Sequence, residues 1–284
     1  MSAVNVAVVG HVEWTRLVRV ERVPVAGDIV HANVVWEGPA GGGAVAAVQL
    51  AKLAGSCTFF TALGEDHLGA RAYEELERLG VTVKAAGRRA QTREAMSLVD
   101  VSGERSTITL GDRLQPHGAD PLPWAEIGDL HAIYFAAGDA AALRKARQAR
   151  MLVATSRELE TVSRAGVRID ALVGSGRDPA ERYNPALMTD PPALLVITDG
   201  VRGGAFSTRE GVAGVYDAVA PPGPVVDTYG VGDSFAAALT FALGARADIP
   251  TALALAAQCG AACASGCGPF SRQLAGLDLM RDQV

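Results

Sequence analysis

A carboxylate follows a glycine-flanked turn in the last quarter of the chain, at the start of an alanine-rich stretch. The run reads Asp227-Thr-Tyr-Gly-Val-Gly-Asp-Ser-Phe and continues as Ala-Ala-Ala-Leu-Thr. Glycines let the backbone approach an anion closely, and the first N–H groups of a helix point outwards at the positive end of its dipole. The run therefore predicts an anion-binding turn at Gly230, Val231 and Gly232, with the carboxylate of Asp233 beside it.

Phosphoryl transfer to an alcohol needs both features. Donors must neutralise charge on the moving group, and a base must take the proton of the acceptor hydroxyl. Aspartate is also favoured as a helix cap, so the run alone does not decide between a catalytic Asp233 and a structural one.

The run is similar to the C-terminal signature of the ribokinase-like (PfkB-type) carbohydrate kinase family, in which alanine usually stands at the position of Val231. Four other runs resemble family motifs in the same order and at similar spacing, over nearly the whole chain. They are Gly38-Pro-Ala-Gly-Gly-Gly-Ala-Val-Ala, Thr61-Ala-Leu-Gly-Glu-Asp-His-Leu-Gly, Thr198-Asp-Gly-Val-Arg-Gly-Gly and Gly266-Cys-Gly-Pro.

This resemblance implies a three-layer α/β/α sandwich with a mainly parallel central sheet. Residues 1–284 would form one domain, with a small β lid built from insertions at about 12–37 and 91–112. It also implies an ATP-dependent kinase that transfers the γ-phosphate to a hydroxyl of a small sugar-like acceptor: a sugar, sugar phosphate, sugar acid or nucleoside. The implied cofactors are ATP and Mg²⁺, with a place for a monovalent cation such as K⁺.

Residue roles follow from the same resemblance. Asp233 would be the catalytic base, the backbone from Gly230 to Gly232 the anion hole, and Asp227 the neighbour of a monovalent cation. The expected ATP-binding residues are Thr198, Gly200, Gly203, Gly266 and Gly268. The expected substrate-binding residues are Glu13, Thr15, Gly41, Gly42, Gly43, Val45 and Arg93.

The chain departs from the family pattern mainly on the substrate side. Thr15 stands where sugar kinases of the family place an aspartate, with Glu13 as the nearest carboxylate, and Val45 replaces an asparagine. Both changes remove partners for sugar hydroxyls, which argues against plain ribose as the acceptor. The Asn-x-x-Glu motif aligns with Ser175-Gly-Arg-Asp178. Asp178 could reach Mg²⁺ through water, or the segment could be an ordinary polar loop.

Gln91-Thr92-Arg93 opens the second insertion. In family members that act on sugar phosphates, a Thr-Arg pair in this region grips the phosphate, and Arg93 could bind an anion bidentately. The alternative is a surface arginine. Trp14 and Trp36 flank the expected mouth of the site, where they could stack on a ring or pack the edge of the lid.

Apolar runs that alternate with helix-like stretches predict the parallel sheet. Expected strands are 4–9, 56–62, 132–136, 151–154, 171–173 and 193–198. Expected helices are 44–53, 67–79 (with Asp66 as N-cap and Gly80 as stop), 233–243 and 251–265. Segments 18–35 and 95–110 read as short β runs, with a hairpin turn at Ser102-Gly103.

Composition excludes several classes of protein. The net charge is −5 with no long block of like charge, which argues against nucleic-acid binding or a role at a membrane surface. No apolar run is long enough to span a bilayer, and the N-terminus lacks a secretory pattern, so we expect a cytoplasmic protein. Residues 38–43 lack the ending of a Walker A loop, and Gly10 begins no G-x-G-x-x-G run.

The cysteines give no metal motif. Cys259, Cys263 and Cys267 recur every four residues, and we interpret them as small buried residues on one helix.

Two further expectations concern partners and function. An exposed edge of the lid sheet favours a homodimer. The altered substrate and Mg²⁺ motifs leave open a catalytically weak relative that binds a nucleotide or metabolite as a sensor or regulator.

Overall fold

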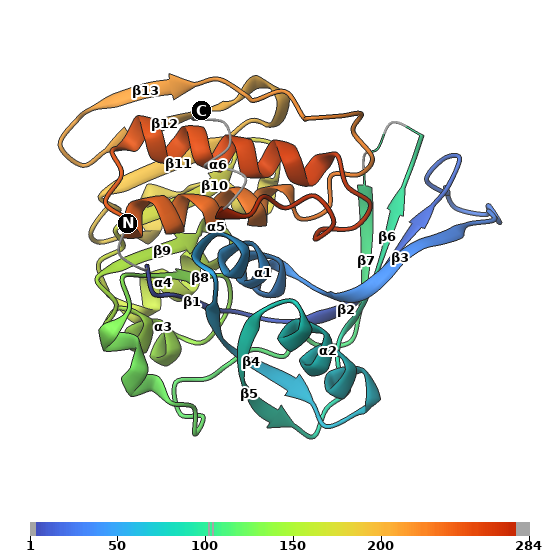
Figure 1. The fold of residues 1–284 in the computed structure, drawn as a ribbon, viewed down its shortest axis with the longest axis horizontal. Helices are drawn as coiled ribbons and strands as arrows, with labels where there is room; N and C mark the ends of the chain where they lie inside the picture. The colour runs from blue at the N-terminus through green and yellow to red at the C-terminus, as the bar shows by residue number, and fades with distance from the viewer. Residues whose placement is uncertain (1–3, 102, 104, 277–284) are drawn as a thin grey trace.

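A computed structural model describes residues 4–101, 103 and 105–276. Its centre is a nine-stranded sheet in the order β13-β12-β11-β10-β9-β8-β1-β4-β5 (Figure 1). Strands from β11 to β5 pair in parallel, and β12 and β13 are antiparallel additions at one edge. The strands are β1 (Val6–Val9), β4 (Cys57–Gly64), β5 (Val81–Arg88), β8 (Ala132–Phe135), β9 (Met151–Thr155), β10 (Ala171–Ser175), β11 (Leu194–Thr198), β12 (Gly204–Thr208) and β13 (Ala213–Tyr216).

Helices cover both faces of this sheet because its strands are apolar on both sides. Val6 and Val8 of β1 join one buried cluster, and Ala7 and Val9 join another, as the two-residue period of a strand requires. The first face is covered by α1 (Gly42–Ala54), α2 (His67–Arg78), α5 (Val231–Gly244) and α6 (Ile249–Ala264), and the second by α3 (Ala140–Ala146) and α4 (Leu159–Ala165). The predicted three-layer α/β/α fold is confirmed.

A four-stranded sheet beside the main one forms the lid (Figure 1). Its strands are β2 (Glu13–Arg19), β3 (Asn33–Ala40), β6 (Glu94–Val99) and β7 (Arg105–Leu110), in the order β3-β2-β6-β7. Only the central β2–β6 pair is parallel. The four strands fall largely within the two segments expected to form the lid.

The predicted helices and core strands are present, with boundaries shifted by at most two residues. Asp66 caps α2 as expected, and Gly80 follows its end with φ 87°. The strands β5, β12 and β13 and the helices α3 and α4 were not predicted. Of the expected turn between β6 and β7, Gly103 has φ 82°, whereas Ser102 lies outside the described residues.

The interpretation of the cysteine stripe was wrong for one member. Cys259 and Cys263 are buried on α6, but the helix ends at Ala264 and Cys267 lies exposed in the following loop. Its Sγ lies 3.5 Å from the carbonyl oxygen of Val35 on the lid. All four cysteines are free thiols.

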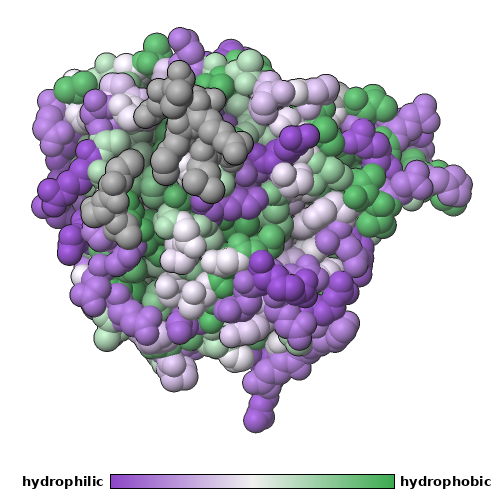
Figure 2. Space-filling model, viewed as in Figure 1, coloured by the Kyte–Doolittle hydropathy of each residue, from purple (hydrophilic) through white to green (hydrophobic). Residues whose placement is uncertain are grey.

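Hydrophobic side chains reach the surface on the lid, where green patches interrupt the polar surface (Figure 2). Val34 is 58% exposed, and Ile108 and Leu110 are also exposed. The homodimer expected at this sheet stays a prediction. Among the described residues, no helix is long and apolar enough to cross a membrane.

Asp66 joins the main body to the lid. One of its carboxylate oxygens accepts from Gly69 N (2.7 Å) and Thr92 Oγ1 (2.8 Å), and the other accepts from Thr92 N (2.6 Å). Burial alone would raise the pKa of Asp66, but these hydrogen bonds outweigh it and hold the pKa below its usual value. The carboxylate therefore fixes the start of α2 and the start of the segment that leads into β6.

We expect Asp66→Ala to destabilise the protein by about 2 kcal/mol, because a charged cap and the anchor of Thr92 are lost together. Because the folded-state pKa is depressed, the difference from wild type should be full above about pH 4 and shrink as pH falls further. Urea denaturation at several pH values measures this difference. Glu74→Ala, which removes an exposed i,i+4 partner of Arg78 on the same helix, is the control and should cost less than about 0.5 kcal/mol. Equal losses in the two variants would contradict the role of Asp66.

Candidate active site

The predicted anion-binding turn opens helix α5. Gly230 is the N-cap residue with φ 81°, and no side chain among the described residues caps the helix there. The N–H groups of Val231, Gly232 and Asp233 lie in the first turn, where a helix supplies no acceptor of its own. A Cβ on Gly230 would lie 2.9 Å from Val45 Cγ1, so position 230 requires glycine for both its conformation and its packing.

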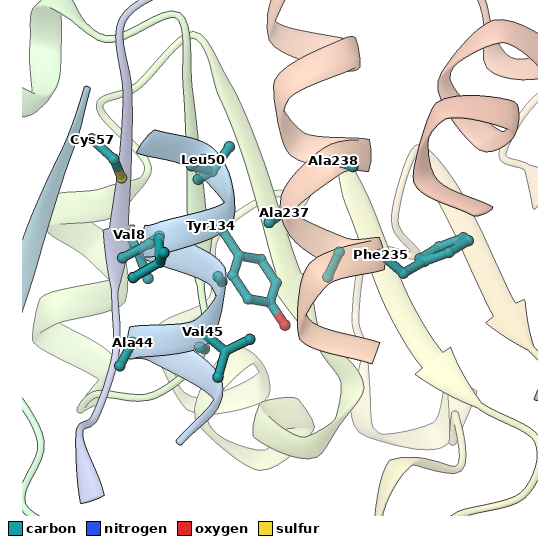
Figure 3. Close-up of a cluster of buried hydrophobic side chains, with 14 of the residues drawn as sticks. Val8, Ala44, Val45, Leu50, Cys57, Tyr134, Phe235, Ala237 and Ala238 are labelled. Atoms are coloured by element: carbon teal, nitrogen blue, oxygen red, sulfur yellow. The ribbon is translucent and has the colours of Figure 1, made fainter. Parts of the chain in front are cut away.

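A second helix N-terminus meets the first one here. Gly41 is the N-cap of α1, and Gly42 begins the helix. A Cβ on Gly42 would lie 2.8 Å from Asp233 Oδ1, so the carboxylate rests directly on the glycine backbone. Figure 3 shows α1 and α5 side by side, with Val45 and Phe235 near their N-terminal ends and the ring of Tyr134 between them. The start of each helix therefore borders Asp233.

The surroundings of Asp233 suit a base. Its side chain is half-buried, and burial raises its pKa to about 6. The negative charge of Glu181 adds to this rise in pKa, while the positive charges of Arg105 and Arg157 oppose it. A carboxylate with this pKa is ionised at neutral pH and still accepts a proton readily.

Tyr229, the variable residue of the signature, organises the neighbouring wall of the site. Its hydroxyl donates to Glu13 Oε1 (3.3 Å), accepts from Gly41 N (3.2 Å) and lies 3.2 Å from Thr15 Oγ1. Thr15 is fully buried and Glu13 is 6% exposed. The side chain of Glu13 lies next to Gly41, whereas the Thr15 hydroxyl is enclosed beside Tyr229.

Arg93 is not a surface arginine. Its side chain is 20% exposed, and its Nε lies 3.6 Å from Glu13 Oε2. Its carbonyl oxygen accepts from Trp14 N, which fixes the segment against β2. The ring of Trp14 is buried and covered by the guanidinium of Arg71, so it packs the lid and offers no face to a ligand.

Asp227 is a buried carboxylate behind the anion-binding turn. It accepts from Tyr229 N and Gly268 N, both at 3.0 Å. Burial raises the pKa of Asp227, and these two hydrogen bonds oppose that rise. Asp227 thus ties the loop of Gly266 and Gly268 to the start of α5. Whether it also neighbours a monovalent cation stays a prediction.

The loop at Gly268 also touches the lid. Gly268 has φ 70°, and a Cβ there would lie 2.6 Å from Trp36 Cγ. Trp36 in turn meets Phe270 edge to face. The indole of Trp36 therefore packs the lid against the expected nucleotide loop.

The expected Mg²⁺ residue is already engaged. Asp178 Oδ2 lies 2.6 Å from Arg157 Nη2, and its Oδ1 accepts from Ala180 N. Burial raises the pKa of Asp178, but the hydrogen bonds and Arg157 outweigh it, so the pKa lies below its usual value. In the described part of the chain, no group of three or more His, Cys, Asp or Glu side chains could hold a metal ion. Asp178 fits a metal only through intervening water.

The expected ATP turn follows β11. Thr198 ends the strand, and its hydroxyl donates to Gly174 O. Asp199 N donates to Gly203 O, and Gly200 and Gly203 have φ values of 59° and 79°. The glycines allow the tight turn, which stands at the carboxyl edge of the sheet like the start of α5.

The structure therefore brings Glu13 and Asp233 to the glycines of α1, with Arg93 next to Glu13, and joins Asp227 to Gly268. Sequence reasoning missed Tyr229, Arg105, Arg157 and His11, which approach the same site. Tyr229 lies inside the signature and His11 directly follows Gly10. Their places next to these motifs were the one feature of the sequence that could have indicated a role at the site. Nothing in the sequence connected Arg157 with Asp178.

The comparisons with known proteins identify the family and the fold. The model of the pfkB family of carbohydrate kinases matches residues 3–162 and 136–271. This chain belongs to that family.

Solved structures show the same fold at low identity. The chain is similar to a ribokinase of Arabidopsis thaliana complexed with ribose and ATP (20% identity, TM-score 0.75, 98% of each chain). It is also similar to a microbiome-derived acarbose kinase (21% identity, TM-score 0.81, 99% of each chain). A third similar structure is an adenosine kinase of Sinorhizobium meliloti (19% identity, TM-score 0.76, 99% of each chain). No curated protein matches the sequence.

Asp233→Asn should stabilise the protein at pH 8 by about 1–2 kcal/mol and leave its stability unchanged near pH 4. Because the folded-state pKa is about 6 against an ordinary 3.8, ionisation weakens the folded state as pH rises between these values. Asparagine stays neutral throughout and avoids that loss. Chemical denaturation of both proteins at pH 4 and pH 8 tests the assignment. A loss of stability at pH 8, or the same shift at both pH values, would contradict it.

Proposed function

We propose that the protein is an ATP-dependent phosphotransferase that moves the γ-phosphate of ATP to a hydroxyl of a small sugar-like acceptor. The observation that supports this most strongly is the carboxylate of Asp233, with a pKa raised to about 6, at the meeting point of two helix N-termini. A nucleotide-binding module has no use for a base in that position. The structural neighbours named for ribose, acarbose and adenosine agree with an alcohol acceptor.

In this proposal each group at the site has one task. Asp233 takes the proton from the acceptor hydroxyl as that oxygen attacks phosphorus. The N–H groups of Val231, Gly232 and Asp233 donate to the oxygens of the moving phosphoryl group. Asp178 would contact the water shell of a Mg²⁺ ion that enters with ATP, and that ion would neutralise phosphate charge.

The acceptor side favours a ligand other than plain ribose. Thr15 and Val45 are both fully buried, and Val45 packs on Gly230. Glu13 and Arg93 are the charged groups that remain beside the glycines of α1. The acceptor therefore needs polar groups that match a carboxylate and a guanidinium.

The first test measures ADP release from Mg·ATP over a panel of sugars, sugar phosphates, sugar acids and nucleosides. Wild type should show acceptor-dependent ADP formation, and Asp233→Asn should lower kcat by about 10²- to 10⁴-fold with ATP binding retained. The wild-type rate should rise with pH through about 6, because Asp233 must be ionised. Equal rates in the two proteins would contradict the role of Asp233. If folded protein that binds ATP forms no ADP with any acceptor of the panel, the result would favour the nucleotide-binding sensor or regulator.

The contact between Gly42 and Asp233 gives a second test. In Gly42→Ala the new methyl group would displace the carboxylate, and a shift of about 1 Å lowers kcat roughly 10²-fold. Gly128→Ala is the matched control, because a Cβ at Gly128 meets no atom within 4 Å. Steady-state rates and melting temperatures of both variants are compared with wild type. Full activity in Gly42→Ala would show that Asp233 need not rest on this backbone.

A further inference from the structure

The ring of His11 lies next to Gly41 and Gly42, and Gly42 is the glycine that contacts Asp233. His11 follows β1, and a Cβ on Gly43 would lie 2.7 Å from its carbonyl oxygen and 2.8 Å from its nitrogen. A Cβ on Gly41 would lie 3.0 Å from its Nε2 and Cδ2. A Cβ on Gly42 would lie 2.8 Å from Asp233 Oδ1 and 3.9 Å from His11 Cε1. The imidazole and the carboxylate are therefore neighbours across Gly42.

The two ring nitrogens of His11 have different surroundings. Nδ1 is buried and has no hydrogen-bond partner within the described residues, whereas the residue as a whole is half-buried. A buried N–H without an acceptor is rarer in proteins than an unpaired acceptor. The neutral ring therefore carries its proton on Nε2, the nitrogen nearest Gly41.

Burial and the positive charges around His11 keep its ring neutral. Burial lowers its pKa to about 3, and the positive charges of Arg113, Arg93 and Arg157 act in the same direction. At any working pH His11 is thus a hydrogen-bond donor without a charge.

Glu13 complements this donor on the other side of Gly41. The Cβ position of Gly41 lies 3.2 Å from Glu13 Cγ. Tyr229 and Arg93 hold the Glu13 carboxylate in place, as described above, and it can accept a further hydrogen bond. One donor and one acceptor therefore flank Gly41, next to the base.

We propose that His11 is a specificity-determining residue that binds the acceptor through Nε2–H, paired with Glu13. His11 donates to one oxygen of the acceptor, and Glu13 accepts from an adjacent hydroxyl. The acceptor class is then a polyol or hydroxy acid with neighbouring oxygens beside the hydroxyl that is phosphorylated, and a simple mono-alcohol is a poor acceptor. This inference rests on the proposed kinase function.

Three substitutions test the position of the donor. Glutamine places an amide nitrogen close to Nε2 of histidine, asparagine places one close to Nδ1, and leucine offers neither. With the best acceptor of the panel, His11→Gln should stay within about 3-fold of the wild-type KM, and His11→Asn and His11→Leu should raise it at least about 10-fold. The KM for ATP should not change in any of them. His117→Gln, at an exposed histidine of a surface loop, is the control.

Two results would overturn the inference while the kinase function stands. One is an unchanged acceptor KM in His11→Leu, and the other is rescue by asparagine with failure of glutamine.

An NMR measurement separates failure of the inference from failure of the proposed function. Long-range ¹H–¹⁵N spectra of the five histidines, with His11 assigned by its absence in His11→Gln, report which ring nitrogen carries the proton. We expect His11 to be neutral and protonated on Nε2 down to about pH 4. A proton on Nδ1, or a charged ring at neutral pH, would overturn the donor role. This readout needs no acceptor, so it decides the question even if the panel yields no ADP.

Discussion

The site depends on a contact that leaves no room for a side chain. The backbone of α1 at Gly42 contacts Asp233 at the start of α5. Val45 likewise leaves no room for a side chain at Gly230. These contacts let two helix N-termini approach one carboxylate. Without them Asp233 would be more exposed to solvent, and its pKa would fall towards the ordinary value.

Part of this arrangement could be read from the sequence. The turn at 230–233 was predicted because its glycines, helix start and carboxylate are adjacent in the sequence and form a recognisable motif. The core strands were predicted because buried parallel strands are continuous apolar runs. The strands β12 and β13 were missed because they are short and partly exposed at the sheet edge, so neither period nor composition marks them.

The contacts between distant residues could not be predicted. Tyr229 reaches Glu13 and Gly41 because the fold packs α1, which follows Gly41, against α5, which follows Tyr229. The pairing of Arg157 with Asp178 depends on the neighbouring ends of β9 and β10. A sequence without the fold gives no distance between such residues, and several arginines compete for each carboxylate.

Two of the contacts between the lid and the body lie at the start of β6 and on β3. Asp66 anchors the segment that enters β6, and Trp36 of β3 lies on the loop of Gly268. The first contact lies next to Arg93, which is expected to bind the acceptor, and the second lies on the expected nucleotide loop. Movement of the lid would therefore alter both sides of the site together.

The parts of the site come from opposite ends of the chain. Glu13 and the glycines of α1 stand within the first 43 residues, and Asp233 stands in the last quarter. A chain emerging from the ribosome can build β1, α1 and most of the sheet before α5 exists. The glycines of α1 then lack the neighbouring carboxylate of Asp233 until α5 packs against α1. In the proposed function, a chain that terminates before α5 would lack the base and could not transfer phosphate.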